Sequence, residues 1–177
     1  MSKFSSLTLY AMVPCCLAIC AALGCGSGTT LKAYPTTGTV NYKGKPLDNA
    51  TVNFITAGKG EGQPSTVIGL GTTDKDGKFR IQTNYDPTSM PLDGAVEGKH
   101  QVTIHKYIPP KGMTEEDLAA MQAKETKIME EKGIVPPGDI TPSRIPFLPP
   151  KYQNPVMSEL SADVTRAGKN DFTFDLK

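Results

Sequence analysis

The sequence predicts an all-β fold, an antiparallel β-sandwich of about seven short strands with one helical insertion. Three stretches support this fold class. Residues 38–54 contain two runs of alternating apolar and polar residues around a Lys-Gly-Lys-Pro turn. Asp76-Gly77 lies between two further runs of this kind, and residues 160–176 contain the last two. Period-two alternation is typical of strands with one buried face, and Asp-Gly between such runs favours a tight turn.

The overall charge of the chain is nearly balanced. Among its 177 residues, 19 are Lys or Arg and 18 are Asp or Glu. Lys3 is the only charged residue in the first thirty, so removal of a leader leaves 18 of each sign. Binding to nucleic acid relies largely on Lys and Arg that neutralise phosphates, so we expect no nucleic-acid partner. The length suits about one domain.

Residues 1–24 are expected to form a signal peptide with a signal helix. Lys3 precedes an apolar run from Leu7 to Leu23 that is too short for a convincing membrane span. The run leads to Cys25 through Gly24, which resembles a bacterial lipobox, although Ala22 stands where Leu is usual. We favour lipid attachment at Cys25, and an ordinary secretory signal cut nearby remains the alternative.

The cysteines support an exported, membrane-anchored chain. All four lie in the first twenty-five residues, so the domain has neither a disulfide framework nor a catalytic thiolate. Residues 25–33 are expected to form a flexible tether to a domain over residues 34–177, because Gly and Ser resist ordering. We expect two partners: the membrane, through the lipid, and an unidentified protein or glycan of the cell envelope. The domain is expected to face the periplasm or the cell surface.

The first three strands are expected at residues 37–42, 51–56 and 66–72. Inward-facing positions on the first two are Val40, Tyr42, Ala50, Val52 and Phe54. Residues 57–65 between the second and third strands contain three glycines. A phosphate-binding glycine loop needs a helix N-terminus behind it, and no helical pattern follows, so we favour a solvated hairpin loop.

The next stretch, residues 73–81, contains a possible calcium loop. Asp74 and Asp76 have Asp-x-Asp-Gly spacing, but an EF-hand also needs a third oxygen ligand, a later Glu and flanking helices. We favour a structural turn, with Phe79 and Ile81 facing the core, and expect no metal or cofactor. The alternative is a calcium site made by acids gathered at one end of the domain: Asp74, Asp76, Asp86, Asp93 and Glu97.

The two histidines fall on one strand, expected at residues 99–107. His100 shares a face with Val102 and Ile104, whereas His105 falls on the opposite face and is the more exposed in this interpretation. The two rings therefore cannot share a metal ion. Neither forms a visible nucleophile–base pair, and no Gly-x-Ser-x-Gly sequence is present, so catalysis is not favoured.

A helix is expected at residues 115–132, inside an insertion over about residues 109–155. Thr114 and Asp117 have capping-box spacing, and Gly133 provides a stop. Its narrow apolar stripe (Leu118, Met121, Ile128 and Met129) suits a helix lying along an edge or extending into solvent. The Pro-rich run 134–155 is expected to pack over the domain and cover its own apolar residues Ile140, Ile145, Phe147 and Leu148.

The last two strands are expected at residues 160–165 and 171–176, joined by a hairpin at residues 166–170. Their inward residues are Ala162, Val164, Phe172, Phe174 and Leu176. These strands complete the count of about seven.

The order and spacing of these motifs resemble the bacterial carboxypeptidase regulatory-like domain, which has transthyretin-like (prealbumin-type) architecture. Three stretches carry the resemblance: residues 38–54, Thr72 to Ile81 and Gly94 to Ile104. It implies a β-sandwich that is usually non-catalytic and assists folding, interaction or surface binding. Transthyretin-like hydrolases end in a Tyr-Arg-Gly-Ser motif, whereas this chain ends in Phe-Asp-Leu-Lys. That activity is therefore not expected.

These observations favour a non-enzymatic, lipid-anchored envelope module with a structural or interaction role. A calcium- or glycan-binding surface module is the alternative, and a hydrolase is the least favoured. The absence of Trp weakens a sugar-binding platform, since aromatic side chains supply the flat apolar contact surface.

Overall fold

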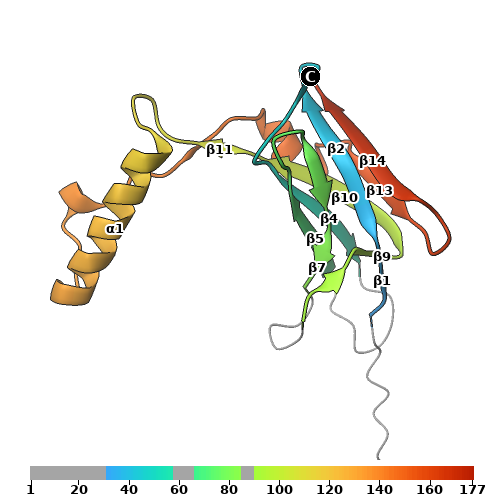
Figure 1. Ribbon diagram of the computed structural model, residues 1–177, viewed down its shortest axis with the longest axis horizontal. Coiled ribbons are helices and arrows are strands. Elements are labelled where there is room, and N and C mark those ends of the chain that lie inside the picture. The colour runs from blue at the N-terminus through green and yellow to red at the C-terminus, as the bar shows by residue number, and fades with distance from the viewer. Residues whose placement is uncertain (1–30, 58–65, 85–89) are drawn as a thin grey trace, which may run out of the picture. The chain divides into compact units, whose positions relative to one another are not determined.

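Two β-sheets packed face to face form the framework of the protein (Figure 1). The computed structural model describes residues 31–57, 66–84 and 90–177. The expected signal peptide 1–24, Cys25, most of the loop 57–65 and Asp86 lie outside these residues. The described part is mostly antiparallel β-structure with one α-helix, so the all-β prediction is confirmed.

The larger sheet has six strands, all antiparallel to their neighbours. Its order is β13 (Ser161–Val164), β10 (Gly98–His105), β4 (Thr51–Ala57), β5 (Thr66–Thr72), β7 (Gln82–Thr83) and β8 (Leu92–Asp93). The inward face of β4 and β10 is aliphatic and aromatic, and Val52, Phe54, Val102 and Ile104 are all fully buried.

The smaller sheet is organised around β2 (Thr36–Tyr42). Its neighbours are β14 (Asn170–Leu176) on one side, and β3 (Lys45–Pro46) and β6 (Lys78–Arg80) on the other. β14 runs parallel to β2 over seven residue pairs, with Thr173 opposite Thr39 (Figure 1). The expectation of a purely antiparallel sandwich is therefore wrong at this pair.

Two short ribbons complete the β-structure. β1 (Ala33–Tyr34) pairs with β9 (Ala95–Val96), and β11 (Tyr107–Ile108) pairs with β12 (Ile145–Pro146). The described residues thus hold fourteen strands, many of only two residues, rather than about seven. Short pairings of this kind leave no alternation in the sequence, so pattern analysis does not detect them.

Phe54 lies at the centre of the core between the sheets. Its ring centroid is 5.7 to 6.2 Å from those of Phe79, Phe172 and Phe174, which all belong to the smaller sheet. Aromatic pairs at such separations add stabilisation beyond their buried area. The inward positions expected on the strands are confirmed, except that Tyr42 and Phe172 are only partly buried.

The connections between strands differ from the expected hairpins. Lys43 and Gly44 close a tight turn between β2 and β3, after which the chain crosses to β4 in the other sheet. Residues 166–170 likewise cross from β13 in the larger sheet to β14 in the smaller. The hairpin predicted at residues 166–170 is therefore wrong, and the two runs of residues 38–54 likewise belong to different sheets, because alternation identifies the buried face of a strand but not its partner. The hairpin predicted across residues 57–65 is confirmed by the antiparallel pairing of β4 with β5.

The Asp76-Gly77 turn also connects the two sheets. β5 precedes it in the larger sheet, and β6 follows it beside β2 in the smaller. Two residues later β7 returns to pair with β5. Ile81, between β6 and β7, donates its N–H to the carbonyl of Thr36. Residues 78–83 thus form one segment whose first part pairs with the smaller sheet and whose last part pairs with the larger sheet.

The helix α1 (Glu115–Lys132) occupies the expected residues. Thr114 and Asp117 form the capping box, and Gly133 ends the helix with φ 69° and an N–H donated to Met129. Only Leu118 of this helix is buried, as its narrow apolar stripe predicts. Two 3₁₀ turns follow, η1 (Pro137–Asp139) and η2 (Pro150–Gln153).

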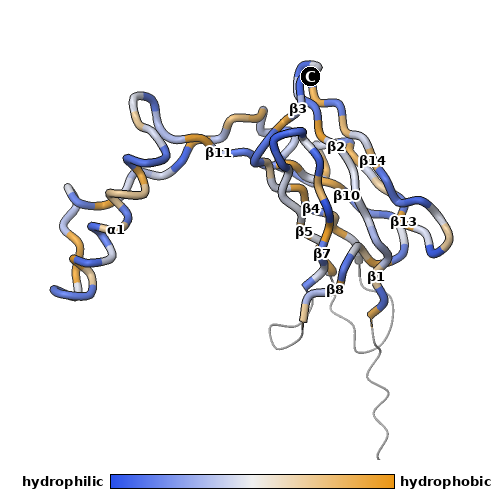
Figure 2. Tube along the Cα trace, in the orientation of Figure 1, coloured by the Kyte–Doolittle hydropathy of each residue, from blue (hydrophilic) through white to orange (hydrophobic). Residues whose placement is uncertain are grey.

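The Pro-rich run covers less of its own apolar surface than expected. Leu148 is buried, but Ile140, Ile145 and Phe147 are 51%, 44% and 41% exposed. Apolar residues can be followed along β11 and its neighbouring segment in Figure 2. The prediction is therefore wrong for these three side chains. Ile145 lies in the two-stranded β11–β12 ribbon, which has no second layer to bury it, whereas Ile140 ends η1 and Phe147 follows the ribbon.

The folded unit begins before the expected boundary at residue 34. It spans Leu31–Lys177, the side chain of Leu31 is buried with Val67 and Val96, and Ala33 already belongs to β1. The tether expected over residues 25–33 is therefore too long at its C-terminal end.

Candidate functional site

A groove lies where the edge of the sandwich meets the N-terminus of α1. Its volume is about 520 Å³. The lining residues come from four separate segments of the chain: Asn49, Thr51, His105, Tyr107, Glu115, Ser143 and Arg144. Convergence of distant segments around a mostly polar hollow makes this groove a candidate binding site.

His105 presents a largely neutral imidazole to the groove. Partial burial lowers its pKa, because the charged form loses hydration. Its Nε2 lies 3.1 Å from the hydroxyl of Thr103 on the same strand, and its ring stacks near that of Tyr107 at 18° and 6.4 Å. These contacts orient the ring along the wall of the groove.

Glu115 and Arg144 form an ion pair across the groove wall, joining the first turn of α1 to the returning chain. Their opposite charges offset one another, so the pair contributes little net charge to the groove. Both side chains remain about half exposed. A guanidinium and a carboxylate side by side can donate to and accept from neighbouring hydroxyl groups of a ligand.

The groove contains hydrogen-bonding groups without an arrangement for nucleophilic catalysis among the described residues. The hydroxyl that His105 contacts belongs to the buried Thr103, which is 1% exposed and does not line the groove. Ser143 lines the groove, and no described contact joins it to a base. The groups that line the groove are thus amide, hydroxyl and imidazole groups and one ion pair.

The two histidines occupy different environments, as expected from their positions on β10. His100 is 2% exposed in the core, where its Nε2 lies 2.8 Å from the carbonyl of Val96 and its ring packs on Phe54. His105 is on the other face of the strand and lines the groove. Across residues 31–57, 66–84 and 90–177, no group of three or more potential metal-ligating side chains comes together.

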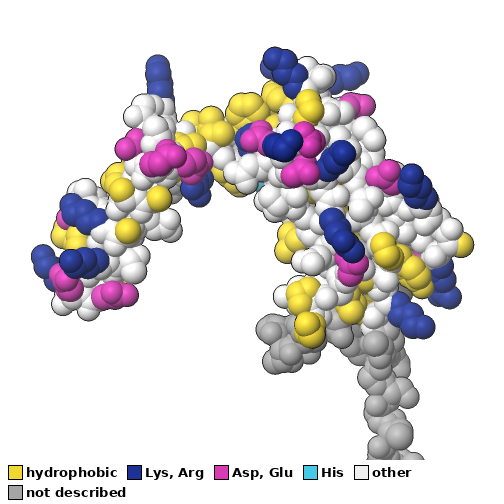
Figure 3. All heavy atoms as spheres, in the orientation of Figure 1, with side chains coloured by type: hydrophobic (Ala, Val, Ile, Leu, Met, Phe, Trp, Pro, Cys, Tyr) yellow, Lys and Arg dark blue, Asp and Glu magenta, His cyan; other side chains and the backbone are white. Residues whose placement is uncertain are grey.

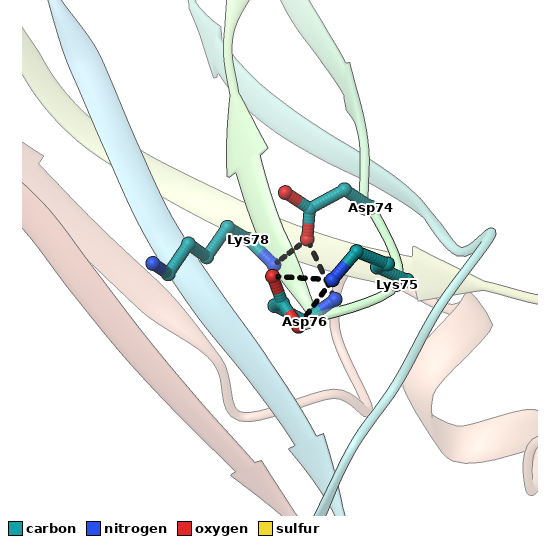
Figure 4. A network of polar contacts seen from close by, with 4 residues as sticks. All are labelled: Asp74, Lys75, Asp76 and Lys78. Carbon is teal, nitrogen blue, oxygen red and sulfur yellow. Dashed lines mark hydrogen bonds and ion pairs between the residues drawn. The ribbon is translucent and has the colours of Figure 1, made fainter.

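Asp74 stabilises the turn at residues 74–78, for which a calcium loop was the alternative prediction (Figure 4). One oxygen of its carboxylate accepts the backbone N–H groups of Asp76 and Lys78, each at 2.9 Å. The carboxylate of Asp76 pairs instead with Lys75 at 3.3 Å. Asp74 therefore has a role in backbone geometry, and the two carboxylates are engaged with different partners.

The other acids of the suggested cluster are also engaged separately. Asp93 pairs with Arg80, whose guanidinium lowers the pKa of that carboxyl. Glu97 pairs with Arg166 at 2.7 Å. Asp86 lies outside the described residues. The described acids are thus distributed over three local ion pairs and one turn, rather than gathered at one end.

Exposed apolar side chains concentrate on residues 107–147, which we call the arm: β11, α1, η1, β12 and their connections. Six of the eleven large exposed hydrophobic residues in the described part belong to it: Tyr107, Met129, Ile134, Ile140, Ile145 and Phe147. Only one of the twenty buried hydrophobic residues, Leu118, does. Hydrophobic atoms are visible on its surface in Figure 3.

The groove is not evident in the amino-acid sequence. Asn49, Ser143 and Arg144 lie in turns and Pro-rich chain, where no spacing links them to His105 or Glu115. Pairing of β11 with β12 is what brings residues 143–144 back to the strand that carries His105. The sequence nevertheless contained one indication of the β11–β12 pairing. The apolar residues Tyr107 and Ile108 precede the helix, and the apolar Ile145 follows it.

No family model matches this chain, and no match was found among curated proteins or solved structures. The resemblance to the carboxypeptidase regulatory-like domain therefore stays a prediction. Within the described residues, no helix is both long enough and apolar enough to cross a membrane.

Proposed function

We propose that this protein is a non-enzymatic, lipid-anchored interaction module of the bacterial cell envelope. In this proposal the sandwich is a scaffold of the transthyretin-like, carboxypeptidase regulatory-like type, Cys25 carries the lipid, and the arm provides the contact surface. The observation that carries the proposal is the distribution of apolar side chains. The sandwich buries most of them, and the arm exposes most of its own.

The arm has the composition of a contact surface. Its exposed apolar residues are spaced along α1 and the returning chain, and charged residues such as Lys127 and Glu131 surround them. Exposed apolar surface rimmed by polar residues marks interaction sites in soluble proteins. A rigid scaffold that presents a divergent insertion is also a common way to place binding residues.

The arm is tested by polar substitution at its exposed apolar positions. In Met129→Ser/Ile134→Ser/Ile140→Ser we expect loss of cross-linked envelope partners, while circular dichroism and the melting temperature stay close to wild type. The matched control is Ile68→Ser/Leu70→Ser, which removes two residues that are 41% and 47% exposed on the larger sheet. Equal cross-linking by all three proteins would contradict a role for the arm.

The anchor is tested independently by mass spectrometry of the mature protein. Acyl mass on an N-terminal Cys25 is the expected result, and Cys25→Ala should release the protein from the membrane fraction. Two or more chains are expected, because a single acyl chain holds a protein at a membrane only marginally. A mature chain without acyl mass would exclude the anchor and leave the role of the arm unaffected.

A second candidate function is recognition of a neutral glycan in the groove. The specific observation in its favour is Tyr107, whose 45%-exposed ring lies among the amide of Asn49 and the hydroxyls of Thr51 and Ser143. Saturation-transfer NMR with a neutral N-acetylglucosamine oligosaccharide tests this function. Transfer should be lost in Tyr107→Ala and kept in Tyr107→Phe, and absence of transfer to wild type would exclude the function.

A further inference from the structure

Four lysines meet at one end of the sandwich, although they are distant in sequence. Lys43 lies in the turn after β2 and Lys45 begins β3, and the N–H of Lys43 donates to the carbonyl of Leu176, next to Lys177. The hydroxyl of Tyr152 bonds both the N–H and the carbonyl of Lys177, which places Lys151 beside them. We call Lys43, Lys45, Lys151 and Lys177 the lysine end.

Two of these lysine side chains, Lys43 and Lys151, lie over aromatic rings. The Nζ of Lys43 lies 5.1 Å from the ring centroid of Tyr42, and that of Lys151 lies 4.7 Å from the ring of Tyr152. Tyr42 in turn makes an edge contact with Phe147 at 5.6 Å. Cation–π contacts of this length are attractive and hold a long side chain over an apolar surface.

The four charges have no acidic partner in the part of the chain that the structure describes. All four side chains are exposed, and none takes part in a described ion pair, in contrast to all three arginines. Nearby, Lys75 pairs with Asp76 and Lys106 pairs with Asp48. The backbone N–H of Lys78 donates to Asp74, and Asp175 accepts from the amide of Asn41. The side chains of seven lysines and four aspartates leave three positive charges, which the α-carboxylate of Lys177 reduces to two. Figure 3 shows Lys and Arg side chains over this end.

The lysine end lies away from the point where the described chain begins. The described chain begins at Leu31, before the start of β2, whereas Lys43 follows the end of that strand. Seven residues of β-strand span about 23 Å, so the length of β2 separates the lysine end from that point.

The chemistry of the lysine end favours a flexible chain of repeated negative charges over a folded acidic protein. Lysine ammonium groups are compact, strongly hydrated point charges, while Arg is the cation enriched in the cores of protein interfaces. The lysines come from a tight turn, a short strand, a 3₁₀ turn and the last residue of the chain, and this spread suits a ligand that places one charge after another along its length. The partly exposed Tyr42, in contact with the exposed Phe147, adds flat apolar surface beside Lys43.

We propose that the lysine end binds a linear acidic polysaccharide. This inference deepens the proposed function, on which it rests for the envelope location. It assigns a partner class to a surface separate from the groove and from Met129, Ile134 and Ile140 of the arm. Binding is driven mainly by release of counterions from the polymer. The rings of Tyr42 and Phe147 add contacts to the apolar faces of the sugars.

The test measures binding of the full chain, in detergent, to polygalacturonate over a range of salt concentrations. Lys43→Gln/Lys45→Gln/Lys151→Gln/Lys177→Gln should bind at least about tenfold more weakly at low salt, with a shallower salt dependence, because each lost charge reduces counterion release. The matched control removes four exposed lysines elsewhere, with Lys32→Gln/Lys99→Gln/Lys111→Gln/Lys169→Gln. It should bind almost as wild type, and unchanged melting temperatures show that both variants are folded.

Equal losses in the two fourfold variants would overturn the assignment, since binding would then follow net charge alone. Stronger binding to polyglutamate, or to phosphatidylglycerol vesicles, would replace the polysaccharide by an acidic protein or a lipid surface and also overturn it. Failure of wild type to bind polygalacturonate would exclude the lysine end as such a site. The acyl mass on Cys25 and the cross-linking by the arm report separately on the proposed function.

Discussion

The sandwich and the arm use the same kinds of residue in opposite ways. In the sandwich, aromatic side chains from two sheets surround Phe54, which is fully buried. In the arm, one buried leucine, a capping box and surface ion pairs such as Lys124–Asp139 hold a helix against a 3₁₀ turn. The stability of the arm is thus expected to be local and small, since exposed ion pairs contribute at most about 1 kcal/mol each.

This difference separates the two tasks of the chain. A buried core makes the sandwich stable without help from the arm, and so leaves the arm free to expose apolar side chains. Regions with few buried contacts open at low free-energy cost, and elements that bind partners are commonly of this kind. Four comparisons, in order of decreasing expected effect, test how far the two regions are independent.

The largest effect is expected for Phe54→Ala in the core. Removing a fully buried ring that contacts three other phenylalanines should lower the free energy of unfolding by about 3–5 kcal/mol. The measurement is urea denaturation followed by circular dichroism. Leu118→Ala is the matched change in the arm, and it should shift the same transition only slightly. A comparable loss would mean that the arm and the sandwich unfold as one unit.

The second effect compares two glycines with positive φ. Gly94 has φ +108°, and an added Cβ would lie 1.9 Å from the carbonyl oxygen of Tyr34. Gly94→Ala should therefore cost at least about 2 kcal/mol of stability, from backbone strain and from the displaced ribbon. Gly112, at φ +86° in the arm, has no atom within 4 Å of that position.

Gly112→Ala should cost about 1 kcal/mol or less, and only in local stability. Thermal unfolding of both glycine variants checks the comparison. Similar melting temperatures in the two would show that backbone strain, rather than the contact with Tyr34, determines the loss.

The third effect concerns the capping box of α1. Thr114→Ala removes the hydroxyl that accepts the N–H of Asp117 at 3.1 Å, which should destabilise the helix by about 1 kcal/mol. Hydrogen exchange should accelerate in the first turns of α1, while strands β4 and β10 stay protected. Thr114→Ser retains the hydroxyl and should exchange as wild type. Faster exchange in the strands of Thr114→Ala would contradict the independence of the arm.

The smallest effect is a pH dependence from His105. Burial lowers its pKa below the ordinary value of 6.5, so just below that pH the unfolded chain binds a proton that the folded chain does not. Stability should therefore fall as the pH drops from about 6.5 and level off below the folded-state pKa. Melting temperatures between pH 7.5 and 5 measure this effect.

His105→Gln should flatten the profile in that window. The carboxyls whose pKa is lowered, such as those of Asp48 and Asp93, act only at more acidic pH and do not obscure it. An unchanged slope in the variant would assign the pH dependence to another group.

The sequence allowed prediction of what depends on local pattern. Alternation identified the buried faces of β2, β4 and β10, and the capping residues Thr114 and Gly133 placed α1 at its observed ends. It did not reveal which strands pair, because Val40 and Phe174 would be equally buried in a parallel or an antiparallel neighbour. The lysine end and the groove were missed for the same reason, since each depends on segments brought together by sheet topology.

The parallel pairing of β14 with β2 has a consequence for the time course of folding. Thr37 and Asp171 bond across this pair although they are 134 residues apart in the chain. Contacts between such distant residues slow folding, because a long loop must close before the pair contributes stability. The smaller sheet therefore gains its last strand only after almost the whole domain has emerged from the ribosome. A partly synthesised chain therefore has an unpaired β2 edge. A chain truncated just before residue 170 should keep that edge exposed and be bound by chaperones.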